Sequence, residues 1–278
     1  MTVLPDLKEA GPVVLVGAGK MGFALAQGWL RAGLPPGQLV LIDPEPQATT
    51  IEFARSNGIR LLASPIGVLT RVLVLAVKPQ VMDSVMRQVR PVVGRQTLVI
   101  SIAAGISLAT ITQALQTGRV VRSMPNTPAQ LGRGITGAVP GPEVGEGDRA
   151  LANALLQAAG DVLWFKEESK IDAVTAVSGS GPAYVFHMVE ALAEAARRQG
   201  FSEDDAMLLA RRTVTGAAAL LESDPAPASV LRQNVTSPNG TTAAALAVLM
   251  GQDGLTELLD RAVQAARTRS EELGRGEA

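Results

Sequence analysis

The sequence predicts an α/β protein with a doubly wound, mostly parallel sheet, followed by an all-helical domain. Short Val- and Ile-rich runs alternate with segments of helical apolar spacing over the first 166 residues. These runs are almost continuously apolar, which is typical of parallel strands covered by helices on both faces. From about Glu167 the strand signals cease and long Ala- and Leu-rich helices follow. We therefore expect two domains, residues 1–166 and 167–278.

The predicted strands of the first domain are brief and bounded by Gly, Pro or Asp. They are Val13–Val16, Leu39–Ile42, Val72–Val77, Leu98–Ile102, Arg119–Ser123 and Asp161–Phe165. Apolar residues three and four positions apart predict the helices between them. These helices are Met21–Arg31, Pro46–Ser56, Pro79–Val89, Leu108–Leu115 and Asp148–Ala158.

The second domain has strong helix punctuation. Pro182 suits the first turn of a helix that ends near Gly200, and Ser202–Asp205 has capping-box spacing ahead of a helix reaching about Glu222. Further helices are expected at residues 228–235, 241–251 and 255–273. Several of these helices are apolar most of the way round, so they must be buried on several sides. We expect them to form a large homodimer interface.

Composition excludes several classes of function. The 278 residues carry a net charge of −1, from 25 basic and 26 acidic residues, which gives no electrostatic footprint for nucleic acid or a membrane surface. The longest apolar runs, Val72–Val77 and Ala243–Met250, fall far short of the ~18 residues that a membrane span needs. We expect neither a nucleic-acid nor a membrane partner.

Cysteine and histidine usage limits the chemistry further. The chain has no cysteine and a single histidine, His187, so it has no thiolate nucleophile and no metal site is predicted. His187 lies between Phe186 and Met188 and is expected to be at least partly buried. The lack of cysteine fits a reducing compartment, and a cytoplasmic location is expected.

A glycine motif predicts dinucleotide binding and a Rossmann-like first domain. GxGxxG follows the first strand directly and opens a helix. Gly17 permits the tight turn, Gly19 lets the backbone approach a pyrophosphate, and Gly22 allows the helix to pack closely on the strand. The helix N-terminus then offers free N–H groups to phosphate.

Asp43 ends the second strand and has two interpretations. It is placed to accept hydrogen bonds from the adenosine ribose, which would favour NAD and repel a 2′-phosphate. It is equally suited to begin a turn before Pro44. No arginine lies near it in the sequence, so NADH is modestly preferred over NADPH.

Three consecutive strands end in small or polar loops, which are Ala76–Pro79, Ser101–Gly105 and Met124–Pro128. Open α/β sheets bind ligands at this carboxyl edge, so the three loops are expected to converge on one site. Lys78 either lies near the phosphates or nicotinamide, or is a solvated lysine at a helix start.

Two hydroxyl-rich clusters in the second domain suggest a small anionic substrate. Ser178–Pro182 and Thr236–Thr242 are each expected to open a helix with exposed N–H groups, although capping alone explains either one. No lysine follows Lys170. Because hydroxyacid dehydrogenases need a lysine or histidine to handle the alcohol proton, reduction of a protonated C=N bond fits better.

With these segments in order along nearly its whole length, the chain resembles pyrroline-5-carboxylate reductase. The glycine loop, Ala76–Pro79, Ser101–Gly105, Met124–Pro128 and Ile171–Tyr184 are similar to family segments. The most specific match is Asn234–Thr242, which resembles the signature near the C-terminal end of the family. The family usually has two glycines where this chain has Asn239-Gly240. Because Asn tolerates left-handed backbone angles, the loop geometry should survive.

The resemblance implies reduction of 1-pyrroline-5-carboxylate to L-proline, the last step of proline biosynthesis, with NADH or NADPH. It also implies an intertwined helical dimerisation domain and in many members a ring of dimers. Thr242 would donate a hydrogen bond to the ring nitrogen and is the expected catalytic residue. The expected substrate-binding residues are Ser178, Ser180, Gly181, Val235, Ser237, Gly240, Thr241 and Thr242. The expected cofactor-binding residues, from motif and resemblance together, are Val16, Gly17, Ala18, Gly19, Lys20, Met21, Gly22, Asp43, Ala76, Val77, Lys78, Pro79, Ile102, Ala103, Ala104, Asn126, Glu168 and Asn234.

Two rival functions stay open at this point. A hydroxyacid reductase or another imine reductase would keep the glycine loop but should show a lysine or acidic base in the helical half, and none is evident. A non-catalytic nucleotide sensor would not need the Ser/Gly/Thr clusters.

Overall fold

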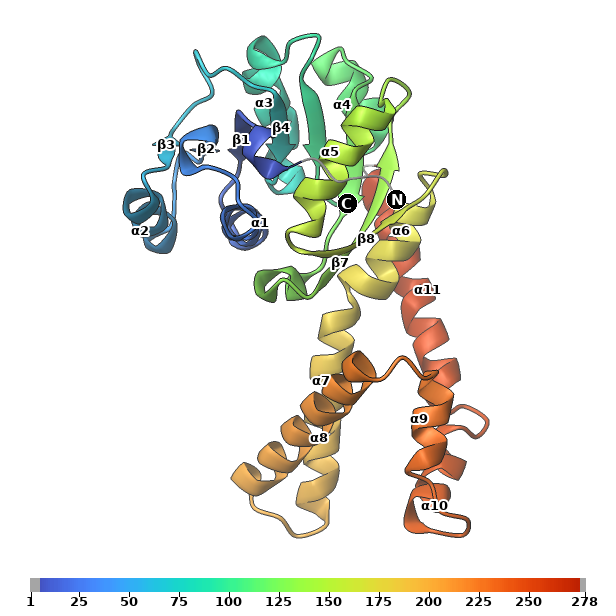
Figure 1. Cartoon of the computed structure of the whole chain (residues 1–278). Helices are drawn as coiled ribbons and strands as arrows, with labels where there is room; N and C mark the ends of the chain where they lie inside the picture. Colours follow the sequence, from blue (N-terminus) through green and yellow to red (C-terminus); the bar gives the residue numbers. More distant parts are fainter. Residues whose placement is uncertain (1–5, 276–278) are drawn as a thin grey trace. The chain divides into compact units, whose positions relative to one another are not determined.

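One eight-stranded sheet organises the N-terminal part of the chain in the computed structural model, which describes residues 6–275 (Figure 1). Its strands lie in the order β3-β2-β1-β4-β5-β6-β7-β8. All neighbouring pairs are parallel except β6 and β7, which are antiparallel. The strands are β1 (Val13–Val16), β2 (Leu39–Ile42), β3 (Arg60–Leu62), β4 (Val72–Leu75), β5 (Leu98–Ser101), β6 (Val120–Met124), β7 (Gly134–Pro140) and β8 (Gly160–Trp164).

Helices cover both faces of this sheet. Alternate residues of β1 divide between two apolar clusters: Val13 and Leu15 pack with α1 and α5, whereas Val14 and Val16 pack with α3 and α4. The indole N–H of Trp29 on α1 donates to the Leu155 carbonyl of α5 at 2.8 Å, which ties two helices of one face together. The predicted doubly wound, mostly parallel sheet is confirmed. The helices are α1 (Lys20–Arg31), α2 (Ala48–Asn57), α3 (Pro79–Val89), α4 (Leu108–Leu115), α5 (Glu146–Gln157) and α6 (Lys170–Val174), with short 3-10 turns at Leu7–Glu9, Pro36–Gln38, Arg90–Val92 and Thr127–Leu131.

Two strands and one helix were not predicted. These are β3, β7 and α6. Glycines and a proline within Gly134–Pro140 suppress strand signals, and β7, like β8, runs antiparallel to the other strands of the sheet. Strand β4 ends at Leu75, two residues before its predicted end, because Ala76 and Val77 already belong to the loop that leads to α3.

The described chain divides into two compact units. Residues 6–180 and 266–275 belong to the first, and residues 181–265 form the second. Helix α6 follows the predicted domain boundary at residue 166, yet it packs on β6 and β7 and so belongs to the first unit. The boundary between predicted domains 1–166 and 167–278 stays a prediction, and the outermost residues of both lie outside the described range.

The second unit consists of helices with almost no core of their own. They are α7 (Gly181–Arg198), α8 (Glu203–Ser223), α9 (Ala228–Asn234), α10 (Thr241–Leu249) and the start of α11 (Leu255–Gly274). Ser202 accepts from the Asp205 N–H at 3.2 Å, as its capping-box position predicts. Among residues 181–265, only Ala193, Ala206 and Ala210 are buried. Large apolar side chains are exposed instead, for example Phe186 at 65% and Val248 at 76%.

His187 departs from its prediction. Its side chain is 81% exposed in this single chain, and Nδ1 lies 3.1 Å from the Glu190 carboxylate. Since α7 buries only Ala193, a residue in the middle of this helix need not be buried.

Among residues 6–275, no helix is both long and apolar enough to cross a membrane, and no cluster of three or more His, Cys, Asp or Glu side chains could hold a metal.

Candidate active site

The glycine loop lies at the carboxyl end of β1 and has the shape that a dinucleotide requires. Gly17 has a φ of +91°, and its N–H donates to the Ile42 carbonyl at 2.8 Å. A Cβ on Gly22 would lie 2.1 Å from the Gly17 carbonyl oxygen, so only glycine allows α1 to begin this close to the loop. A Cβ on Gly19 would meet nothing within 4 Å. The space beside Gly19, at the start of α1, therefore fits a pyrophosphate approached by backbone N–H groups.

Asp43 is held against this loop. Its Oδ2 accepts from the Ala18 N–H at 2.9 Å, and its Oδ1 accepts from the Glu45 N–H at 3.0 Å. The second bond is the turn-initiating contact that one of its two interpretations predicted. The first bond places a carboxylate next to the turn that is predicted to bind phosphate, where the ribose-binding interpretation needs it. The two roles are therefore compatible.

The loops after β4, β5 and β6 share one edge of the sheet, because these three strands are adjacent and parallel. Their carboxyl ends are tied together: the Ile102 N–H donates to the Leu75 carbonyl at 3.0 Å, and the Ser123 hydroxyl donates to the Ser101 carbonyl at 2.9 Å. Lys78 is exposed at the start of α3. The structure thus brings the predicted loops Ala76–Pro79 and Ile102–Ala104 to the edge where the glycine loop lies.

Asn126 follows β6 and is buried. Its Oδ1 accepts from the Ile135 N–H at 2.9 Å, so the side chain already fixes the start of β7. Its role toward a cofactor stays a prediction.

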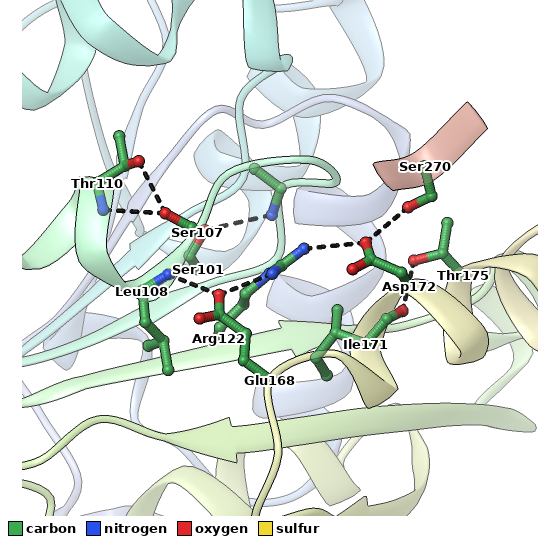
Figure 2. Close-up of polar contacts among 11 residues, drawn as sticks. Ser101, Ser107, Leu108, Thr110, Arg122, Glu168, Ile171, Asp172, Thr175 and Ser270 are labelled. Carbon is green, nitrogen blue, oxygen red and sulfur yellow. Dashed lines mark hydrogen bonds and ion pairs between the residues drawn. The ribbon is translucent and has the colours of Figure 1, made fainter. Parts of the chain in front are cut away.

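Glu168 lies between β8 and α6 and meets the loop after β5. Its Oε1 accepts from the Leu108 N–H at 2.7 Å and from Arg122 Nη1 at 2.7 Å (Figure 2). The carboxylate therefore sits at the first N–H of α4, where the helix dipole favours negative charge. This contact connects Glu168 to the segment Ile102–Ser107, in which the predicted nicotinamide residues lie.

Sequence reasoning missed three side chains of this cluster, Arg122, Asp172 and Ser270. Arg122 Nη2 lies 3.6 Å from Asp172 Oδ1, which accepts from the Ser270 hydroxyl at 2.8 Å (Figure 2). Arg122 carried a usable signal, because a charge inside the apolar strand Val120–Met124 needs a buried partner. Asp172 and Ser270 are 98 positions apart, and nothing local in the sequence connects them.

The cluster Ser178–Pro182 contains the start of α7, with Pro182 in its first turn as predicted, but this helix start is not free. Helix α6 runs into a π-helical turn, Thr175–Gly179, and α7 begins directly afterwards at Gly181. The Ser180 N–H donates to the Thr175 carbonyl at 2.8 Å, and the Ser178 hydroxyl donates to the Val174 carbonyl at 3.1 Å. The expected free helix start is therefore wrong here, because the preceding turn occupies these groups. The assignment of Ser178, Ser180 and Gly181 to the substrate stays a prediction without that support.

The second cluster has the predicted shape. Helix α10 begins at Thr241 after Gly240, and no side chain caps it. Asn239 has a φ of +58°, so asparagine adopts the left-handed conformation that the resemblance required at this position. The Gly240 N–H donates to the Ser237 carbonyl at 3.1 Å and closes the turn. Asn234 ends α9, and Asn234, Val235 and Thr241 are exposed, while Thr242 is partly buried.

The predicted residues fall into two sets, one in each compact unit. The glycine loop, Asp43, the loops after β4 to β6, Glu168, Ser178 and Ser180 belong to the first unit. The second unit holds Gly181, Asn234, Val235, Ser237, Gly240, Thr241 and Thr242.

Both parts of the chain match known families. Residues 168–273 match the family described as pyrroline-5-carboxylate reductase dimerisation. Residues 12–105 match the family described as NADP oxidoreductase, coenzyme F420-dependent.

Whole proteins match over nearly their full length. The pyrroline-5-carboxylate reductase of Vibrio alginolyticus is 39% identical over 269 residues, which cover 95% of this chain and 98% of that protein. The enzyme of the same name from Pisum sativum is 35% identical and covers 98% of this chain and 100% of its own.

Solved structures agree with these sequence matches. A pyrroline-5-carboxylate reductase from Coxiella burnetii superimposes with a TM-score of 0.86 at 33% identity, covering 95% of this chain and 99% of that one. A pyrroline carboxylate reductase from Plasmodium falciparum, whose structure has NADP bound, gives a TM-score of 0.79 at 28% identity, covering 94% and 97%. The resemblance that the sequence motifs predicted is confirmed: the chain belongs to the pyrroline-5-carboxylate reductase family.

Proposed function

We propose that this protein reduces 1-pyrroline-5-carboxylate to L-proline with NADH or NADPH, the last step of proline biosynthesis. The observation that carries the proposal is the extent of the family match. Relatives with this activity in their names are 39% and 35% identical across 95% and 98% of the chain. The nucleotide-binding sheet and the helical second unit are therefore both those of the family.

The first unit supplies the cofactor site. Phosphates are bound by the N–H groups of the glycine loop and the start of α1, beside the open position at Gly19. The loops Ala76–Pro79 and Ile102–Ala104 line the nicotinamide end, and Glu168 lies near the cofactor. Asn234, which belongs to the second unit, is proposed as a further cofactor residue. When bound, the cofactor supplies the hydride that reduces the C=N bond.

The second unit supplies the substrate site. The N–H groups in the first turn of α10, which no side chain caps, bind the substrate carboxylate together with the turn Ser237–Gly240. The Thr242 hydroxyl donates a hydrogen bond to the ring nitrogen. The imine is already protonated when it reacts, so Thr242 orients it rather than acting as a strong acid. The main contribution of the protein is placement of the reacting groups, which lowers the barrier by several kcal/mol.

A direct assay tests the function. Purified protein mixed with NADH and 1-pyrroline-5-carboxylate should consume NADH and form L-proline in equal amounts. A 2-oxoacid such as pyruvate, which a hydroxyacid dehydrogenase reduces with NADH, should give no turnover. Binding of NADH without consumption would contradict the proposal and favour a nucleotide sensor, and reduction of the 2-oxoacid alone would favour the other rival.

We further propose that NADH is the preferred cofactor. The segment Asp43–Thr50 carries the carboxylates of Asp43 and Glu45 and no lysine or arginine. A 2′-phosphate beside Asp43 would face like charge, which costs several kcal/mol. We expect kcat/KM for NADH to exceed that for NADPH at least ~10-fold.

Replacement of Asp43 by asparagine tests this preference. Asp43→Asn keeps an oxygen that can accept from the Ala18 N–H, so the loop should hold while the ratio of kcat/KM values shifts toward NADPH. The matched control is Asp161→Asn on the edge strand β8, which should leave the ratio unchanged. A wild-type enzyme that strongly prefers NADPH would overturn the assignment.

The protein is proposed to be a homodimer, and dimers are proposed to assemble further into a ring. A unit with three buried alanines and many exposed Leu, Val and Phe side chains needs a second copy to bury its apolar faces. Sedimentation at micromolar concentration should give a dimer or a multiple of it. Phe186→Glu, on an exposed apolar face of α7, should weaken the dimer at least ~100-fold, since a buried unpaired charge costs several kcal/mol.

The matched control for self-association is Ile66→Glu. Ile66 is 85% exposed but lies in the first unit, so its replacement should leave the sedimentation unchanged. A monomeric wild-type protein would contradict the proposed dimer.

A cytoplasmic location is also proposed, because the absence of cysteine fits a reducing compartment.

A further inference from the structure

Two arginines near β6 are each paired with carboxylates. One lies toward the carboxyl ends of the parallel strands and the other lies at their amino ends. Arg122 lies within the strand, toward the carboxyl end where the glycine loop also lies. Arg119 precedes the strand at its amino end and pairs with Asp148 at 2.5 Å. In both residues the Nε atom is buried and has no hydrogen-bond partner among the described residues. The two pairs have similar chemistry and differ in what they connect.

Arg122 connects three parts of the first unit that are distant in the sequence. Its guanidinium, with the side chain only 6% exposed, meets Glu168 at 2.7 Å and Asp172 at 3.6 Å. Glu168 in turn accepts from the Leu108 N–H at the start of α4. A strand, the β8–α6 connection and the end of the loop after β5 are thereby fixed to one another (Figure 2).

The last turns of α11 complete this cluster. The Ser270 hydroxyl donates to Asp172 Oδ1 at 2.8 Å, and Ser270 itself is buried. A few residues later, the helix end lies against the middle of the same loop. A Cβ on Gly105, whose φ is +72°, would lie 3.5 Å from the Leu273 carbonyl carbon and 3.6 Å from the Gly274 nitrogen. The loop is thus held at its start by β4, at its end by Glu168 and in its middle by α11.

We propose that Arg122, Asp172 and Ser270 are positioning residues that hold the segment Ile102–Leu108 in the conformation that binds the nicotinamide cofactor. The inference rests on the proposed function, because it takes Ile102–Ala104 as cofactor residues. None of the three side chains needs to touch the cofactor. Asp172 and Ser270 fix the Arg122 guanidinium, Arg122 fixes the Glu168 carboxylate, and Glu168 fixes the start of α4. The C-terminal end of α11 therefore sets the affinity for the cofactor.

Weakening this chain of contacts should raise the dissociation constant of the cofactor without removing a cofactor contact. Asp172→Asn removes the charge that faces Arg122 and keeps an oxygen for Ser270. We expect it to raise the Kd for NADH roughly 3- to 10-fold, the size of one typical lost hydrogen bond. The KM for NADH should rise in the same proportion, while kcat at saturating NADH stays within about twofold. Ser270→Ala should also raise the Kd for NADH, but by less than Asp172→Asn. Ser270→Thr, which keeps the hydroxyl, should retain the wild-type Kd.

The experiment measures the Kd for NADH and NADPH by fluorescence, together with Tm, on the full-length protein. Asp148→Asn is the matched control, because it removes the charge facing Arg119 at the other edge of the sheet. It should lower Tm to a similar extent and leave both Kd values within about twofold of wild type. Ser270→Ala carries the test if Asp172→Asn does not fold.

Each outcome decides the proposal. A rise in Kd for Asp172→Asn and Ser270→Ala, but not for Asp148→Asn, supports it. Wild-type Kd values in Ser270→Ala and in any folded Asp172→Asn overturn it, as does an equal rise in Asp148→Asn, since either result means that the cluster only stabilises the fold. Failure of the wild-type protein to bind NADH and NADPH, or to reduce 1-pyrroline-5-carboxylate, would instead contradict the proposed function.

Discussion

Replacing Gly19 by alanine should weaken cofactor binding roughly 100-fold and hardly change the stability of the protein. The added methyl group would meet no atom within 4 Å, and Gly19 has a φ of −65°, which alanine adopts freely. Its only cost to the fold is a weaker N-cap of α1, about 1 kcal/mol or less. The methyl group would occupy the space into which the pyrophosphate must come. Loss of one or two hydrogen bonds to a charged phosphate accounts for the expected effect.

A second glycine on the same helix provides the control. A Cβ on Gly28 would lie 2.6 Å from the Ala158 carbonyl oxygen, so Gly28→Ala overpacks the contact between α1 and the end of α5. We expect it to destabilise the protein by about 1–3 kcal/mol and to leave the Kd for NADH within about twofold. Fluorescence titration and thermal unfolding of both variants give the comparison. Tight NADH binding by Gly19→Ala would place the phosphates elsewhere and remove the basis of the cofactor site.

The parallel sheet was predictable because each of its strands can be identified from a short stretch of the sequence. Runs such as Val13–Val16 and Leu39–Ile42 are apolar on both faces and end at turn residues, and the structure has them at the predicted bounds. Strand β7 was missed for a tertiary reason. Its Gly137 lies under α6, where a Cβ would come within 2.8 Å of the Val174 side chain. The glycine that makes room for the helix also removes the strand signal, and only the folded structure reveals why.

The candidate site was also predictable only where local sequence determines it. The predictions that failed concern features that tertiary structure determines. The glycine loop and the loops after β4 and β5 follow from their sequence context, since parallel strands bring their carboxyl ends to one edge. Ser178–Pro182 has the composition of a helix start, but the π-helical turn Thr175–Gly179 ahead of it uses the groups that the composition seemed to leave free. The cluster of Arg122, Asp172 and Ser270 joins positions that no local pattern connects.

Thr242→Ala should lower kcat roughly 10- to 100-fold and leave the affinity for NADH nearly unchanged. This is less than a strong general acid supplies, because in the proposed mechanism the substrate nitrogen is already protonated and needs only a hydrogen-bond partner to hold it. Thr242 lies in the first turn of α10, in the second compact unit, whereas the glycine loop lies in the first. Its hydroxyl should therefore affect turnover without disturbing the glycine turn that we propose binds the cofactor phosphates. Steady-state kinetics with saturating NADH, combined with fluorescence titration of NADH, separate the two quantities.

The hydroxyl itself, rather than the size of the side chain, should determine this result. Thr242→Ser keeps the donor and should retain much more activity than Thr242→Ala, although serine loses the methyl group that restricts its rotamer. Thr215→Ala, which removes an exposed hydroxyl from α8 in the same unit, should leave kcat unchanged. If Thr242→Ala turned over as fast as the wild type, the substrate nitrogen would have to be held by another group. In that case the first turn of α10 would bind only the substrate carboxylate. Its backbone N–H groups, which the alanine and serine replacements leave in place, would then be the contribution of this unit to the reaction.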